Sequence, residues 1–68
     1  MVNTSRLKGI IAENNTSQRE VALKLGMYPE TFYRKMKRGI FDSDEIEEMI
    51  KILNIEDPVA IFFNNQVT

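Results

Sequence analysis

The 68-residue chain contains no cysteine and no histidine. Without cysteine it can form no disulfide and offers no thiolate to a metal. Without histidine it lacks the commonest general base, zinc ligand and pH-sensitive side chain of proteins. No nucleophile–base arrangement, glycine-rich phosphate loop or metal-ligand cluster takes their place. We therefore expect no enzymatic activity, no bound metal and no cofactor.

Long apolar runs are also missing. The longest, VAIFF at 59–63, is far shorter than the roughly 20 residues of a membrane-spanning helix. The first residues, MVNTSRLKG, lack the apolar core of a signal peptide. We expect a single small domain with a thin core, no membrane partner and a cytoplasmic location.

The net charge of −1 conceals two oppositely charged halves. Residues 1–41 carry eight Lys or Arg against three Glu, a net charge of +5. Residues 42–68 carry one Lys against seven Asp or Glu, a net charge of −6. A basic half can face a polyanion while the acidic half faces away. Alternatively, both halves are ordinary solvated surfaces, and charge alone does not decide between these interpretations.

Apolar spacing and capping signals predict an all-α fold without strands, repeats or linkers. The expected helices form a compact five-helix bundle over 1–68, and a frayed tail follows them at 64–68. The predicted helical ranges are 4–13, 17–25, 29–38, 43–53 and 58–63. The predicted buried stripes are Leu7, Ile10, Ile11, Val21, Ala22, Leu25, Phe32, Met36, Ile46, Met49, Ile50 and Leu53.

The segment from Ser17 to Gly39 holds a dense set of local signals. Ser17 and Glu20 form an S-x-x-E capping box. Gly26 lies where a helix can end in the left-handed conformation, and the apolar Met27 then returns to the core. These residues predict two helices joined by a tight turn.

Capping signals mark other helix starts as well. Asn3 and Thr4 are candidate N-caps of the first helix. Asp42 and Glu45 resemble a second capping box, and Asp57 precedes a proline at the first position of the last helix.

With these helices placed, the chain resembles the Cro/repressor-type (XRE-like) helix-turn-helix family, the lambda-repressor-like DNA-binding domains of bacteriophage regulators. The resemblance covers nearly the whole chain. The matching residues are Ser17, Gln18, Glu20, Ala22, Leu25, Gly26, Met27, Phe32, Arg34, Lys35 and Met36. Two positions depart from the family pattern: Tyr28 stands where a Ser or Thr cap is usual, and Gly39 comes one residue late.

The resemblance implies a sequence-specific regulator of transcription that binds double-stranded DNA. It implies a Cro-like repressor that occludes its operator, competes with another repressor and works at the nucleoid in the cytoplasm of a bacterial host. In such proteins the N-terminal part of the second helix of the pair enters the major groove. The residues expected to read bases are Tyr28, Pro29, Glu30, Tyr33 and Arg34. Those expected to contact phosphates are Thr16, Ser17, Gln18, Lys35, Lys37 and Arg38, with Arg6 and Lys8 as further candidates.

Individual roles follow from side-chain chemistry. Arg34 can donate bidentately to guanine, and Glu30 either accepts from cytosine or pairs with Arg34 four residues on. Tyr28 and Tyr33 contact a phosphate or a thymine methyl, or are simply half-buried amphipathic residues. The four cations among residues 34–38 either bind an anionic partner or form a solvated face.

Partners other than DNA remain open at this stage. The apolar segment 59–63 exceeds what one helix face can bury, so it either covers the core or joins a second subunit. We expect a homodimer through the last two helices or this segment, because small regulators bind palindromes as two-fold dimers. Two alternative functions are a protein-interaction module, such as an antirepressor or modulator bound to another regulator, and a structural adaptor.

Overall fold

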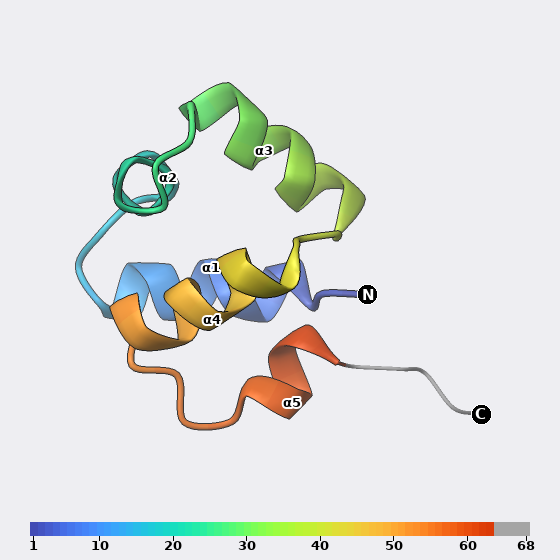
Figure 1. The fold of residues 1–68 in the computed structure, drawn as a ribbon. Helices are drawn as coiled ribbons and strands as arrows, with labels where there is room; N and C mark the ends of the chain where they lie inside the picture. The colour runs from blue at the N-terminus through green and yellow to red at the C-terminus, as the bar shows by residue number, and fades with distance from the viewer. Residues whose placement is uncertain (64–68) are drawn as a thin grey trace.

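The computed structural model describes residues 1–63 and contains five helices in this range (Figure 1). The helices are α1 (Thr4–Glu13), α2 (Gln18–Lys24), α3 (Pro29–Arg38), α4 (Ser43–Ile52) and α5 (Pro58–Phe62). No strand occurs among these residues, so the all-α prediction is confirmed. The predicted boundaries of α2, α4 and α5 differ by one residue, a normal uncertainty for fraying ends. The predicted frayed tail, 64–68, lies outside the described residues.

Side chains cap the helix starts at the predicted places. Asn3, Ser17 and Asp57 each accept the backbone N–H three residues later, at 3.2, 3.1 and 3.3 Å. At α4 the Asp42 N–H donates to Glu45 Oε1 at 2.9 Å. These bonds satisfy amides that have no partner inside the helix or beside it.

Four of the helices end through the same left-handed turn. Asn15, Gly26, Gly39 and Asn54 have φ of 56°, 76°, 71° and 51°. In each case the next residue's N–H donates to the carbonyl five residues earlier, at 3.0 to 3.3 Å. This is the Schellman arrangement, in which the reversed chain satisfies free carbonyls at the helix end. The glycines were predicted to end their helices, whereas the two asparagines were assigned only to polar loops.

One hydrophobic core joins the five helices. In the view of Figure 1, α3 lies above α1 and α4, and α5 lies below them. The Phe32 ring at the centre lies 5.4 Å from the Phe41 ring, in a tilted arrangement. The core residues are Val2, Leu7, Ile11, Val21, Ala22, Phe32, Met36, Phe41, Met49, Leu53, Ile55, Ile61 and Phe62. None of the five helices is long and apolar enough to span a membrane.

The N-terminal residues fasten the end of α3 to α5. Val2 N–H donates to the Gly39 carbonyl at 2.9 Å, and Asn3 N–H donates to the Ile61 carbonyl at 2.7 Å. Val2 itself is buried. Two segments far apart in the sequence are thereby held together beside the N-terminus, which fixes where α3 ends.

A glycine-to-alanine pair tests the left-handed turn after α2. Gly26→Ala should lower the free energy of unfolding by about 1 kcal/mol, because alanine disfavours positive φ. A Cβ at Gly26 would meet nothing within 4 Å, so the cost is conformational and not steric. Urea denaturation measures the change. Gly9→Ala is the control: it lies in α1 in equally open space and should instead stabilise the chain.

Candidate functional site

The α2–α3 pair presents the outer face of α3 to solvent. Residues 25–28 join the two helices, and Figure 1 looks along α2 while α3 runs across the view, so their axes are steeply inclined. Phe32 and Met36 are buried on the inner face of α3. The predicted return of Met27 to the core is also observed, since this side chain packs against it.

Tyr28 opens α3 in the position where a capping side chain was missing from the sequence. Its carbonyl accepts the N–H groups of Thr31 and Phe32 at 3.0 and 3.2 Å. Its side chain makes no capping bond and is 79% exposed. The ring therefore projects from the start of α3 and is available to another molecule.

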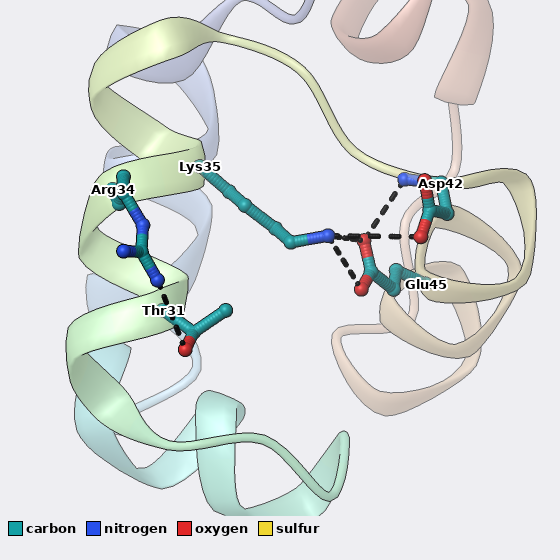
Figure 2. Close-up of polar contacts among 5 residues, drawn as sticks. All are labelled: Thr31, Arg34, Lys35, Asp42 and Glu45. Atoms are coloured by element: carbon teal, nitrogen blue, oxygen red, sulfur yellow. Dashed lines mark hydrogen bonds and ion pairs between the residues drawn. The ribbon is translucent and has the colours of Figure 1, made fainter.

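The predicted base-reading residues lie on the outer part of α3 and at its start. Tyr28, Glu30, Tyr33 and Arg34 are exposed, whereas Pro29 is half-buried. The predicted alternative of a Glu30–Arg34 ion pair is not formed in the part of the chain that the structure describes. Arg34 Nη2 instead lies 3.4 Å from Thr31 Oγ1, a long hydrogen bond along the same helix (Figure 2). Glu30 and Arg34 are therefore both available to a partner.

Lys35 differs from the other cations of α3. Its Nζ donates to both carboxylate oxygens of Glu45, at 3.0 and 2.9 Å, and lies 3.6 Å from Asp42 Oδ2 (Figure 2). The side chains of Lys35 and Glu45 are only 25% and 19% exposed. The same Glu45 carboxylate accepts the Asp42 N–H. Lys35 thus ties α3 to the start of α4, an arrangement that differs from the predicted phosphate contact.

The hydrogen bond to Glu45 raises the pKa of Lys35 above its ordinary value of 10.5, with the nearby charges of Glu45 and Asp42 adding to it against the opposing effect of burial. A group whose pKa is raised by folding stabilises the fold below its unfolded pKa, and this stabilisation is lost as the pH rises through the folded pKa. The Lys35–Glu45 link is therefore fully formed at neutral pH with respect to the lysine.

Replacing Lys35 tests this link. Lys35→Met should lower the free energy of unfolding by about 1 kcal/mol, since it removes a partly buried ion pair while keeping the aliphatic stem. The difference from the parent chain should stay constant through neutral pH and shrink above about pH 10.5, where Lys35 deprotonates. Urea denaturation at several pH values measures it. Lys51→Met, at an exposed lysine 3.9 Å from Glu48, should change stability little, and equal losses for the two variants would contradict the link.

A cleft of about 620 Å³ lies between α1, the start of α2 and α3. Its lining includes three cations, Lys8, Arg19 and Lys37, and no carboxylate. Within residues 1–63 none of these three cations has an ion pair. The lining residues are Thr4, Lys8, Ser17, Gln18, Arg19, Tyr33, Met36 and Lys37. Unpaired positive charge in a concave surface attracts an anion, and the amide, hydroxyl and phenol groups beside it can donate hydrogen bonds.

The cleft gathers only part of the set predicted to contact phosphates. Ser17, Gln18 and Lys37 line it, whereas Thr16, Lys35 and Arg38 do not. Thr16 Oγ1 lies 3.3 Å from Glu20 Oε1, and the Ser17 hydroxyl lies 3.4 Å from the same atom. The predicted capping box is therefore made in one direction only: Ser17 accepts the Glu20 N–H, and the Glu20 carboxylate binds hydroxyls.

The remaining cations of the N-terminal half separate into two places. Lys8 lines the cleft between α1 and α3, whereas Arg6 lines a different one beside Glu13 and Glu56. Sequence reasoning did not select Thr4 or Arg19. Thr4 and Lys8 are four residues apart and so share one face of α1, which is the signal that could have paired them.

Comparison of the chain with protein-family models, curated proteins and solved structures finds no match. Among residues 1–63, no group of three or more acidic side chains is arranged to hold a metal ion. Function is therefore inferred from the cleft and the outer face of α3.

Proposed function

We propose that the chain is a sequence-specific, double-stranded DNA-binding regulator of transcription, a Cro-like repressor that occludes its operator. The cleft between α1, α2 and α3 carries this proposal, because it joins Lys8, Arg19 and Lys37 without a carboxylate. It lies directly beside the exposed face of α3, with Tyr33 and Lys37 belonging to both. On this proposal the protein works at the nucleoid in the cytoplasm of a bacterial host.

The duplex supplies both the charge and the shape for this surface. It carries one negative charge per about 1.7 Å of helix axis, so a strand crossing the cleft would meet its three cations in succession. The major groove of B-DNA, about 12 Å wide, admits an α-helix. Helices α2 and α3 then act as a helix-turn-helix, with α3 in the groove and the cleft on the flanking phosphates.

Separate roles follow for the two halves of α3. Arg34 is the strongest candidate to read a base, since its exposed guanidinium can donate bidentately to guanine. Glu30, which has no intramolecular ion pair among residues 1–63, can accept from cytosine. Lys37 binds phosphate and positions the helix without selecting a sequence. The acidic residues of α4, Asp44, Glu47 and Glu48, are exposed, and they account for the chain's negative net charge.

The salt dependence of binding tests the assignment of the cleft. Lys8→Ala and Lys37→Ala should each reduce the slope of log affinity against log salt by about 0.9, because each removes one phosphate contact. Lys35→Ala should leave the slope unchanged, since its ammonium is held by Glu45. Fluorescence anisotropy with a labelled duplex measures all three slopes.

Lys51→Ala is the matched control, because it removes an exposed positive charge from α4. Its slope should equal that of the parent chain. If Lys8→Ala and Lys37→Ala behaved like this control, the cleft would not lie on phosphate. If the parent chain bound no DNA but captured another regulator, the protein-interaction module would replace the proposal.

A further inference from the structure

A second concave surface, on the flank of the molecule, is lined by apolar side chains. It encloses about 210 Å³ between the N-terminus, the α3–α4 connection and the end of α5, and we call it the flank groove. Figure 1 shows these three segments on one side of the fold. Residues lining the flank groove include Met1, Ile40, Phe41, Ile46, Phe62 and Phe63.

Three of these side chains face solvent to an extent that is unusual for large apolar groups. Met1, Ile40 and Phe63 are 77%, 63% and 56% exposed, while Phe41 and Phe62 are buried beneath them. A single exposed apolar side chain needs no explanation, but a cluster around a groove marks a surface that another molecule covers. Part of the apolar segment 59–63 is therefore left over from the core, as expected from its sequence.

The flank groove is formed before any partner arrives. Backbone hydrogen bonds from Val2 to Gly39 and from Asn3 to Ile61 fix its walls. Met1 packs over Gly39 so closely that a Cβ there would lie 3.0 Å from Met1 Cγ. A partner would not have to order these segments, which removes part of the entropic cost of association.

We propose that the flank groove is the interface of a two-fold homodimer, with Ile40 and Phe63 of each copy inserted into the groove of the other. A two-fold interface uses one surface twice, so that surface must carry both the protruding groups and the hollow that receives them. The flank groove has both, because Ile40 and Phe63 project from its rim and Phe41, Ile46 and Phe62 line it.

The charges around Ile40 favour a second copy of this chain over an unrelated partner. Arg38 lies two residues before Ile40 and Asp42 lies two residues after it, and both are exposed. A two-fold axis beside Ile40 brings Arg38 of one copy against Asp42 of the other, and does so twice. Within one chain Asp42 has only the 3.6 Å contact with Lys35, and its side chain is 77% exposed. The proposal gives Arg38 a protein partner in place of the phosphate expected from the sequence.

DNA does not compete for this surface. The flank groove has no cationic lining residue, whereas the cleft between α1, α2 and α3 has three. A polyanion gains nothing from an apolar hollow. The two surfaces therefore have different occupants, and both can be occupied at once.

Sedimentation equilibrium of the 68-residue chain without DNA tests the dimer. The parent chain should show a monomer–dimer equilibrium, and Ile40→Glu should weaken it by at least about tenfold, because two glutamates would enter an apolar interface. Leu23→Glu is the control, since Leu23 is 55% exposed on α2 and lies outside the groove. It should leave the dimer unchanged. Circular dichroism confirms that both variants keep their helices.

A charge exchange tests the register of the two copies. Arg38→Asp and Asp42→Arg should each weaken the dimer several-fold, and the double variant should restore it, because the pairs form again with reversed sign. Asp42→Arg also alters the start of α4, so each variant is compared below its own melting transition. A parent chain that stays monomeric, or a double variant weaker than both singles, would overturn the proposal. No DNA is present, so failure of DNA binding would leave this result unaffected.

Discussion

Phe32→Ala is expected to unfold the protein at ordinary temperature. Phe32 is fully buried on the inner face of α3 and lies 5.4 Å from the Phe41 ring. Truncating a buried phenylalanine costs about 3–5 kcal/mol, because apolar contacts are lost and a cavity remains. A chain of 68 residues has a total stability of only about 3–10 kcal/mol. Most or all of that reserve would disappear with one ring.

Thermal melting followed by circular dichroism measures this effect. Tyr33→Ala is a matched control, because it removes the adjacent aromatic ring, which is 45% exposed. The control should retain a cooperative transition near that of the parent chain. If Phe32→Ala and Tyr33→Ala melted alike, the inner face of α3 would not be the side that carries the fold.

The second large effect concerns sequence discrimination. On the proposed function, Arg34→Ala should weaken binding to the preferred site by about 1–3 kcal/mol, or roughly 5- to 150-fold. The loss should disappear on duplexes altered at a single base pair, since only that pair accepts from the guanidinium. Competition between duplexes that differ at one position measures this. Lys37→Ala should by contrast weaken every duplex by the same factor.

An equal loss on all duplexes for Arg34→Ala would contradict its assignment as a base reader. It would instead mean that Arg34 contacts the backbone in the same way as Lys37. The hydrogen bond between Arg34 and Thr31 is long, at 3.4 Å, so the guanidinium is not held away from a base by its own helix.

Local signals were sufficient to predict the helices. Asn3, Ser17 and Asp57 cap their helices as expected because a cap depends on residues only three positions apart. Gly26 was equally readable, since glycine tolerates positive φ without cost. Asn15 and Asn54 adopt the same conformation, but an asparagine in a polar loop has several other uses, so its type alone does not reveal the turn.

The site was less predictable because it depends on contacts distant in the sequence. Lys35 resembles Lys37 in a list of cations, yet it lies within reach of Glu45 only after α3 and α4 have packed. The cleft likewise requires α1 to bring Lys8 beside α2, which no spacing within either helix could indicate. Net charge was the least informative property, since it sums over faces that the fold separates.

Binding of the 68-residue chain to a labelled duplex at low salt tests the central claim most directly. We predict binding at micromolar protein, with a slope of log affinity against log salt of about −4 if four or five phosphates are neutralised. An absence of binding at these concentrations, or an affinity that salt does not change, would contradict the proposal that α3 and the neighbouring cleft form a DNA-binding surface.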